Sequence, residues 1–279
     1  MKIFAVIPAR GGSVSIPRKN IVDYRGKPLI SHSIEIALRC KYINEVIVDT
    51  DDDEIAEIAR SYGAVVPYIR PKHLAQNLST DLDVFTHFLE VYTNPDIIVH
   101  LRPTYPNRSL SFLNHCISKF MVNIDHYDSL RTVVKQDKSP FKMYILDTLN
   151  DERLTLLPLF TNLEVNDRKM KEPYNECRQA LPTAYLHNGC IDIVLAKTIK
   201  EGSMCGKRIM PIFMSENHDI DTYEDLNEAA ITKQVCLKCN KEITSTTDTS
   251  TSTSRYCLLC DAPICFSEKC MGLCLCSIF

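Results

Sequence analysis

Residues 3–20 read IFAVIPARGGSVSIPRKN, and this stretch decides the fold. Its apolar beginning, Ile3 to Ile7, predicts a buried strand. The adjacent glycines, Gly11 and Gly12, predict a bend after that strand, because glycine lets the backbone turn freely and lets a ligand approach main-chain N–H groups. The stretch therefore predicts the first strand and first loop of an α/β fold.

The residues around this bend suit an anion. Glycine, serine and cations directly after a first strand are typical of a site for a phosphate chain. The alternative is an ordinary strand-to-helix loop with solvated basic residues. The stretch has neither the G-x-x-x-x-G-K-[ST] of a Walker P-loop nor the G-x-G-x-x-G of dinucleotide-binding folds. The residues that suggest a phosphate site are Arg10, Gly11, Gly12, Ser13, Arg18 and Lys19.

Length and composition are those of an intracellular globular protein. The 279 residues suffice for one large or two modest domains, and 45% are hydrophobic and 24% charged. A formal charge of −3 gives no reason to expect nucleic acid or an anionic membrane as the main partner. No apolar stretch is long enough to span a bilayer, and the N-terminus does not have the pattern of a signal peptide. We expect a cytoplasmic protein.

Strand-like and helix-like segments alternate after the loop. This alternation predicts βαβ units with a parallel sheet covered on both faces. In such a sheet the ligand lies beyond the carboxyl ends of the strands, where the glycine loop and residues 49–53 and 102–108 are expected. The predicted strands are 45–48, 64–68, 96–101, 129–134, 141–146, 190–195 and 208–214, and the predicted helices are 30–38, 55–59, 80–92 and 223–231.

Residues 129–190 are less regular. The segment from Asp147 to Pro182 is polar, rich in proline and poorly periodic. We interpret it as an excursion that covers the site or pairs with another subunit.

Two acidic residues near the end of the globular part suggest a metal site. Asp219 and Asp221 are two positions apart in an apparently extended segment, so their carboxylates point to the same side. Two such ligands, completed by phosphate oxygens, are how Mg²⁺ is usually held in phosphoryl-transfer sites. The alternative is that Asp221 or Thr222 caps the last helix, and both roles are compatible.

Eight of the thirteen cysteines crowd into residues 236–279. Cys236-x-x-Cys239, followed by Cys257-x-x-Cys260, has the spacing of a four-cysteine zinc site. Disulfides and a thiol-rich disordered tail are the alternatives, and the tail's role is either a structural cap or a module that docks a protein partner. We therefore expect domains at 1–234 and 235–279. A second, less regular set of possible zinc ligands is Cys265, Cys270, Cys274 and Cys276.

Several motifs together resemble the N-acylneuraminate (sialic acid) cytidylyltransferase family, the CMP-sialic acid synthetases. That family opens with I-P-A-R-G-G-S-K-G-I-P-R-K-N, from which residues 7–20 differ at Val14 and Ser15. The family's further motifs V-S-T-D-D, R-P-x-x-L-A, L-Q-P-T-S-P-L-R, R-P-N-G and D-I-D-T are matched, in order, by residues 48–52, 70–75, 101–108, 186–189 and 219–222.

The resemblance implies a Rossmann-like nucleotidyltransferase fold and a reaction. A sugar-acid hydroxyl attacks the α-phosphate of CTP and releases pyrophosphate, with Mg²⁺ held by Asp219 and Asp221. It also implies a homodimer in which the 129–190 excursion crosses to the neighbour's site. In the implied site, Arg10 and the backbone of Gly11, Gly12 and Ser13 hold the phosphates, Lys19 and Asn20 lie against the nucleotide, Arg70 approaches the base, and Thr104, Arg178 and Asn188 face the sugar.

Three departures from the family pattern bear on activity and substrate. Val14 replaces a lysine expected at the triphosphate, and losing such a contact costs on the order of 1.5–3 kcal/mol. Arg102 replaces a glutamine in the sugar pocket, where arginine is able to pair with a sugar carboxylate or a different acyl group. Leu186 replaces an arginine.

These departures leave three functions open. The first is an active cytidylyltransferase for sialic acid or a related sugar acid. The second is a catalytically weakened nucleotide- or sugar-binding protein whose tail docks partners. The third is a nucleotidyltransferase on the same fold for another nucleotide, sugar or sugar phosphate.

Overall fold

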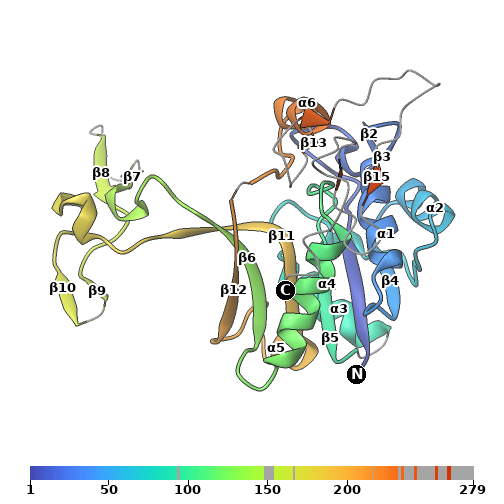
Figure 1. Ribbon diagram of the computed structural model, residues 1–279, viewed down its shortest axis with the longest axis horizontal. Coiled ribbons are helices and arrows are strands. Elements are labelled where there is room, and N and C mark those ends of the chain that lie inside the picture. The colour runs from blue at the N-terminus through green and yellow to red at the C-terminus, as the bar shows by residue number, and fades with distance from the viewer. Residues whose placement is uncertain are drawn as a thin grey trace. The chain divides into compact units, whose positions relative to one another are not determined.

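The computed structural model describes residues 1–92, 95–147, 154–165, 167–215 and 217–231, and four two-residue strands, 234–235, 242–243, 255–256 and 263–264. A six-stranded sheet of order β12-β6-β11-β5-β1-β4 has helices packed around it (Figure 1). Its strands are β1 (Ile3–Pro8), β4 (Glu45–Asp49), β5 (Ile97–His100), β6 (Ser129–Lys135), β11 (Tyr185–Leu195) and β12 (Ile209–Met214). The helices are α1 (Leu29–Arg39), α2 (Asp53–Ser61), α3 (Asp81–Val91), α4 (Leu110–Val122), α5 (Ala196–Lys200) and α6 (Tyr223–Ile231).

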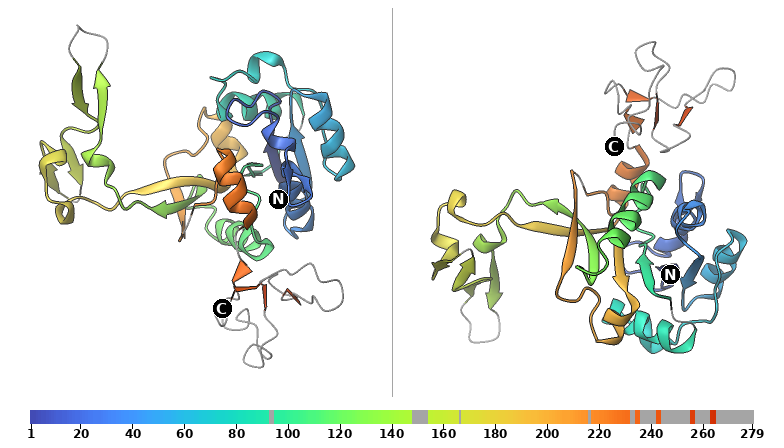
Figure 2. Two further views of the ribbon diagram at one scale, coloured as in Figure 1. Left: turned by 90° about the horizontal axis from the view of Figure 1, so that it is seen from above. Right: turned by 60° about the horizontal axis from the view of Figure 1, so that its bottom comes forward.

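The parallel centre of the sheet confirms the α/β prediction. Strand β1 pairs in parallel with β4 on one side and with β5 on the other, and β11 then joins β5 antiparallel. Both views of Figure 2 show the N-terminal strand, drawn in dark blue, inside the sheet. Because β1 has neighbours on both sides, the loop that follows it emerges between the ends of β4 and β5.

The side chains of β1 alternate between the two faces of the sheet, and those on one face help to form the core. Phe4 and Val6 belong to one buried cluster with Phe85 and Phe88 of α3, which covers that face of the sheet. Helix α3 begins where the sequence predicts: the Thr80 hydroxyl accepts from the backbone of Asp83, and the Asp83 carboxylate accepts from the backbone of Thr80. This capping box holds the first turn of α3 beside the carboxyl end of β5.

The predicted strand 64–68 is wrong in part. The segment forms isolated bridges, Ile47 with Val65 and Thr50 with Ile69, in place of a continuous strand. Pro67 lies between the two bridges, and proline has no N–H to donate to a ladder. Helices α4 and α5 were not predicted.

The chain divides into two compact units. The first comprises residues 1–132, 189–212 and 218 onward, and the second comprises 133–188 and 213–217. The second unit falls within the predicted 129–190 excursion apart from its last five residues, and contains two hairpins. They are β7 (Tyr144–Asp147) with β8 (Thr155–Pro158), and β9 (Leu163–Val165) with β10 (Arg168–Met170). The division at 234/235 stays a prediction, and Cys236, Cys239, Cys257, Cys260, Cys265, Cys270, Cys274 and Cys276 lie outside the described residues.

Candidate active site

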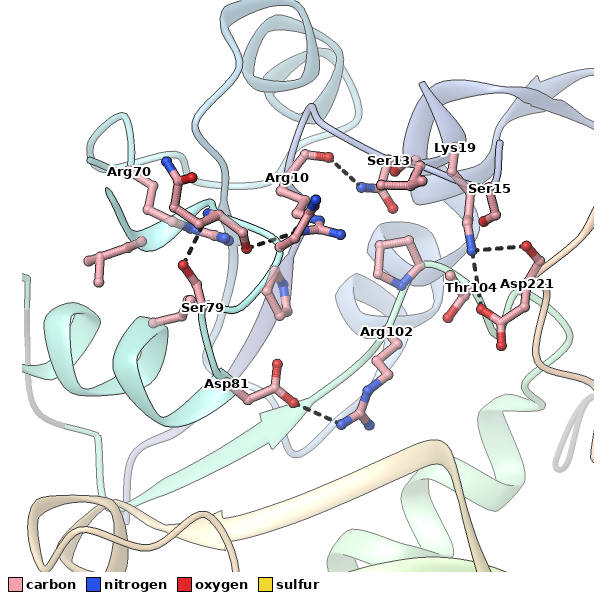
Figure 3. A pocket seen from close by; sticks show the side chains of 18 of the residues that line it. Arg10, Ser13, Ser15, Lys19, Arg70, Ser79, Asp81, Arg102, Thr104 and Asp221 are labelled. Atoms are coloured by element: carbon pink, nitrogen blue, oxygen red, sulfur yellow. Dashed lines mark hydrogen bonds and ion pairs between the residues drawn. The ribbon is translucent and has the colours of Figure 1, made fainter. Parts of the chain in front are cut away.

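A pocket of about 550 Å³ opens at the carboxyl ends of β1 and β5 (Figure 3). All its lining residues belong to the first unit. The glycine loop, the segment between Arg70 and Asp81, the end of β5 and Asp221 converge there, as expected for a parallel sheet. The lining residues with side-chain charge or hydrogen-bonding capacity are Arg10, Ser13, Ser15, Lys19, Asn20, Arg70, Gln76, Asn77, Ser79, Asp81, His100, Arg102, Thr104 and Asp221.

The glycine loop is held by the acidic turn after β4. The Gly11 N–H donates to Asp51 Oδ1 at 2.9 Å, and a Cβ on Gly11 would lie 2.7 Å from Asp52 Oδ2, which explains the glycine. This N–H is therefore engaged within the protein, and neither Gly11 nor Gly12 is among the pocket-lining residues. Asp52 also caps α2, as predicted for the acidic cluster.

Arg18 does not serve the pocket. It has a left-handed backbone (φ 57°), and its guanidinium pairs with Asp52 and Glu54 at the start of α2. Arg10 and Lys19, which come from the same part of the chain as Arg18, do line the pocket. Arg70, from the segment after β4, also lines it.

Lys19 is held at the acidic pair. Its Nζ donates to the Ile220 carbonyl at 3.1 Å. It also donates to Asp221 Oδ1 at 3.2 Å (Figure 3). The capping alternative is met by Thr222, whose hydroxyl accepts from the backbone N–H of Asp225 at 3.1 Å. Capping therefore leaves the Asp221 carboxylate, which is 73% exposed, available at the pocket.

Asp219 is the buried member of the pair. Burial raises its pKa, and the charge of Asp221 adds to that rise, while a hydrogen bond with Thr104 opposes it. Among the described residues, no donor reaches the buried Asp219 Oδ1. A buried carboxylate oxygen without a donor, beside a second carboxylate, is the donor set that suits a hard cation.

Arg10 and Asn20 brace one side of the pocket. Arg10 Nη1 donates to the Gln76 carbonyl at 2.9 Å, and the buried Asn20 side chain donates to the Arg10 carbonyl at 2.9 Å. Arg10 is thereby positioned at both its backbone and its side chain.

Arg70 is buried against an acid that sequence reasoning did not connect with it. Arg70 Nε donates to Asp49 Oδ1 at 2.5 Å, and Nη2 donates to the Asp49 carbonyl at 2.6 Å. The Tyr68 hydroxyl donates to Asp49 Oδ2 at 2.8 Å, and the shared burial raises the pKa of Tyr68 well above its usual value. The signal for Asp49 was present, because an acid replaces the family's serine at the end of a buried strand.

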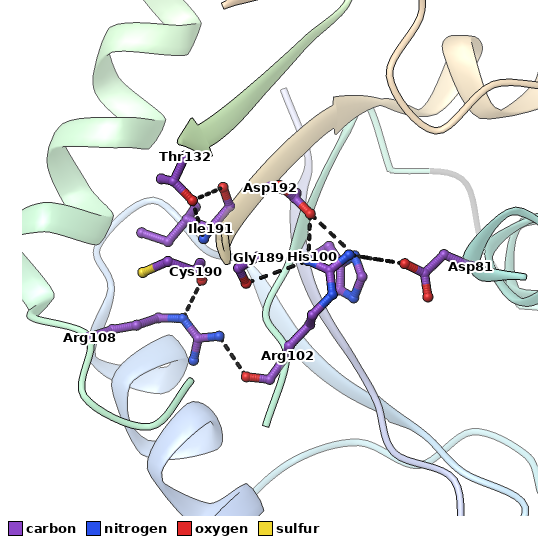
Figure 4. A network of polar contacts seen from close by, with 9 residues as sticks. All are labelled: Asp81, His100, Arg102, Arg108, Thr132, Gly189, Cys190, Ile191 and Asp192. Carbon is purple, nitrogen blue, oxygen red and sulfur yellow. Dashed lines mark hydrogen bonds and ion pairs between the residues drawn. The ribbon is translucent and has the colours of Figure 1, made fainter. Parts of the chain in front are cut away.

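Arg102 lines the pocket, and its guanidinium is paired with two acids of the chain itself. Its Nη1 donates to Asp192 Oδ2 at 2.6 Å and its Nη2 to Asp81 Oδ2 at 3.0 Å (Figure 4). The guanidinium thus has two carboxylate partners within the chain, and its pairing with a sugar carboxylate or a different acyl group stays a prediction. Sequence reasoning missed both acids and the neighbouring His100. Asp192 meets His100 through pairing of β11 with β5, and Asp81 reaches Arg102 from the start of α3, which packs on the sheet.

Arg178 and Asn188 belong to the second unit. Arg178 Nη2 donates to the Asp137 carbonyl at 2.6 Å, and the buried Asn188 amide contacts Met214 Sδ at 3.1 Å. Neither lines the pocket of the first unit, so their contact with a sugar stays a prediction. In the described part of the chain, no three His, Cys, Asp or Glu side chains group as metal ligands, and no helix is long and apolar enough to cross a membrane.

Comparison with known proteins decides the family. Residues 4–182 match the family described as cytidylyltransferase. The chain belongs to this cytidylyltransferase family. It is 32% identical over 231 residues to the CMP-N,N'-diacetyllegionaminic acid synthase of Legionella pneumophila, covering 80% of this chain and 92% of that protein.

Other relatives are covered over a smaller share of their length or share only the fold with this chain. The pseudaminic acid cytidylyltransferase of Campylobacter jejuni is 41% identical over 127 residues, which are 44% of this chain and 55% of that protein. The chain thus spans about half the length of that relative. The structure of CMP:2-keto-3-deoxy-manno-octonic acid synthetase complexed with CTP aligns over 82% of this chain and 97% of that one, with a TM-score of 0.59 and 18% identity. At that identity the likeness shows the nucleotidyltransferase fold alone.

Proposed function

We propose that this protein is an Mg²⁺-dependent cytidylyltransferase that activates a sugar acid with CTP. The sugar-acid hydroxyl attacks the α-phosphate of CTP, giving a CMP-sugar and pyrophosphate. The observation that carries the proposal is a pocket lined by Arg10, Lys19 and Asp221, in a chain of the cytidylyltransferase family. The names of the relatives support a substrate of the sialic acid class, such as a pseudaminic or legionaminic acid.

The residues suit this reaction because displacement at phosphorus requires positioning and charge neutralisation more than covalent help. Arg10 and Lys19 supply positive charge for the triphosphate, and hydrogen bonds within the protein hold both side chains in place. Asp219 and Asp221 would hold Mg²⁺, which supplies further charge neutralisation at the phosphates. The buried, unpartnered Oδ1 of Asp219 supports that assignment.

A pyrophosphate-release assay with the full chain tests the proposal. Each of the four nucleoside triphosphates is combined with sialic, pseudaminic and legionaminic acids and with a set of sugar phosphates, with and without Mg²⁺. We expect release with CTP and a sugar acid, dependent on Mg²⁺. Release with a sugar phosphate or another nucleotide alone would instead favour a different nucleotidyltransferase.

One observation favours a second candidate function, a catalytically weakened protein that binds a nucleotide or sugar. Val14, at the position of the family's triphosphate lysine, lines the pocket with a side chain that carries no charge, and the residue is 77% exposed. Binding of CTP without release of pyrophosphate from any pair would support a nucleotide-binding protein and contradict the enzyme.

We also propose that the second unit forms a homodimer contact. In the β7–β8 hairpin the cross-strand pairs Ile145 with Leu157 and Leu146 with Leu156 are apolar, and all four side chains are exposed. Leu159, Phe160, Tyr185 and Phe213 in the same unit are exposed as well. Neighbouring pairs point to opposite faces of a hairpin, so both faces of this hairpin carry exposed apolar side chains. Exposed apolar side chains gathered in one small unit are typical of a protein interface, and a second copy is the partner that the family resemblance implies.

Zinc binding by the tail also stays a proposal. It rests on the spacing of Cys236, Cys239, Cys257 and Cys260. Metal analysis of the purified protein, compared with a variant that lacks residues 235–279, tests it. Equal zinc content in both proteins would contradict it, and loss of zinc with the tail would support it.

A further inference from the structure

Arg102 ties together three elements at the pocket wall. It directly follows β5, reaches Asp192 on β11 with Nη1, and reaches Asp81, the first residue of α3, with Nη2. The Gly189 carbonyl also accepts from Nη1 at 3.4 Å. Figure 4 shows Arg102 between the two acids, with His100 beside it. The position of Asp81 therefore depends on Arg102.

His100 does not balance the two carboxylates at neutral pH. Its Nδ1 lies 4.0 Å from Asp81 Oδ2 and 3.9 Å from Asp192 Oδ2. Burial, reinforced by the charge of Arg102, lowers the pKa of His100 to about 4 despite the two acids. Burial raises the pKa of Asp81, but the charge of Arg102, and that of His100 once it is protonated at low pH, keep it below its usual value. The two carboxylates are paired directly with one guanidinium, that of Arg102, because the buried Arg108 donates instead to the carbonyls of Cys190 and Arg102 and to the Ser33 hydroxyl.

This charge balance disfavours a carboxylate ligand for Arg102. An incoming carboxylate would have to displace Asp81 or Asp192, and the Asp192 side chain is almost buried. A buried charge that loses its partner costs several kcal/mol. The wall of the pocket at this point is instead suited to a hydrogen-bond donor.

Asp81 offers an acceptor for such a donor. Its side chain is 46% exposed and lines the pocket, and only Oδ2 is used by Arg102. Among the residues that the structure describes, none donates to Asp81 Oδ1. Figure 3 shows the carboxylate at the pocket with one oxygen directed to Arg102 and the other away from it.

We infer that Asp81 accepts a hydrogen bond from a neutral O–H or N–H group of a bound substrate, and that Arg102 and Asp192 are positioning residues that hold Asp81 for this contact. The inference rests on the proposed function and refines it. Two sources present that chemistry: a ribose hydroxyl of the nucleotide, and a hydroxyl or acyl-amide N–H of the sugar acid.

Binding and kinetics of Asp81→Ala in the full chain distinguish the two sources. If a ribose hydroxyl is the donor, calorimetry shows about 10-fold or greater loss of CTP affinity, since hydrogen bonds to charged groups are the stronger ones. The deoxy nucleotide that lacks the donating hydroxyl, 2′-deoxy-CTP or 3′-deoxy-CTP, should then bind to the wild type and to the variant with equal affinity. If the sugar acid is the donor, CTP affinity is unchanged and the KM for the sugar acid rises about 10-fold, with kcat little altered.

Arg102 variants test the positioning role. Arg102→Gln should reproduce the substrate-specific loss of Asp81→Ala, Arg102→Lys should restore part of it, and the double variant Asp81→Ala/Arg102→Gln should lose no more than Asp81→Ala alone. Asp128→Ala is the matched control, because Asp128 pairs with Arg208 at 2.8 Å and neither residue lines the pocket. It should bind both substrates as wild type does.

Several outcomes would overturn the inference. If both the CTP affinity and the KM for the sugar acid are unchanged in Asp81→Ala, Asp81 makes no hydrogen bond with either substrate. An equal loss with every deoxy nucleotide and every sugar analogue would indicate a general structural effect. A wild-type protein that binds no nucleotide and releases no pyrophosphate would overturn the proposed function as well, whereas an active wild type with a silent Asp81→Ala overturns this inference alone.

Discussion

The two compact units bury different kinds of side chain. The first keeps large apolar residues such as Phe85, Phe88 and Phe120 inside and directs charged groups to a pocket. The second leaves much of its apolar surface in solvent, with Ile145 52% and Leu156 63% exposed. Hydrophobic burial drives folding, so a unit that leaves such residues in solvent gains from a further surface. The contrast agrees with the proposed roles, in which the first unit carries out the reaction and the second contacts another copy.

The largest expected effect tests whether the chemistry belongs to the first unit. Lys19→Met removes a positioned cation from the pocket and should lower kcat/KM for CTP about 100- to 1,000-fold, as for other preorganised charge-stabilising groups. Pyrophosphate release at varied CTP measures it. Lys27→Met is the control, because Lys27 pairs with Glu35 and does not line the pocket. Near-normal activity of Lys19→Met would break the assignment of the pocket.

The next effect tests whether the second unit makes the contact. The double substitution Ile145→Asp/Leu157→Asp places like charges on one cross-strand pair and should shift the dimer dissociation constant at least about 100-fold, because charges are depleted from interface cores. Light scattering across a concentration series measures the mass.

The control for this variant comes from the first unit. Val122 on α4 is also a highly exposed apolar residue, at 82%, so Val122→Asp changes a matched side chain and should leave the dimer intact. A wild-type monomer, or a dimer that survives the double substitution, would contradict the interface.

Burial within the first unit also predicts a pH effect. The His100 pKa of about 4 lies below the ordinary value of about 6.5, so the unfolded chain binds the proton first as pH falls. Stability from this group is complete above about pH 6.5 and is lost as the pH drops toward 4. Through this group, the free energy of unfolding should fall by about 2 kcal/mol between pH 7 and pH 5.

Denaturant unfolding at the two pH values measures this loss. Comparison with His100→Asn isolates the histidine, because the variant should lack that part of the pH dependence whatever its overall stability. Identical pH dependence in both proteins would show that His100 is not buried in its neutral form.

The smallest expected effect concerns Val14, the exposed apolar residue at the pocket. Val14→Lys restores the family's cation and should raise kcat/KM for CTP about 10-fold, the value of one charge-assisted contact at its lower end. Val14→Met, of similar length but uncharged, is the control. An unchanged rate in Val14→Lys would mean that Arg10 and Lys19 already supply the charge.

Much of the first unit was predictable because its signals are local. The apolar run from Ile3 to Ile7 and the alternation of strand-like and helix-like segments predicted the parallel centre of the sheet. The glycine loop and residues 102–108 were predicted to meet, since carboxyl ends of parallel strands share one edge, and the family resemblance placed Lys19 and Asp221 in the same site. Pro67 was a visible reason to doubt the strand at 64–68, but bridges on either side of it depend on partners distant in sequence.

By itself, the sequence determined the α/β class, the bend after the first strand and the family, because glycine bends, strand periodicity and motif order are properties of neighbouring residues. Tertiary structure alone decided which charges are free to act. Asp49 holds Arg70, Asp81 and Asp192 hold Arg102, and Arg18 turns to α2. The physical reason is that each ion pair joins residues brought together by sheet pairing and helix packing, and a paired, buried charge has a different chemistry from a solvated one.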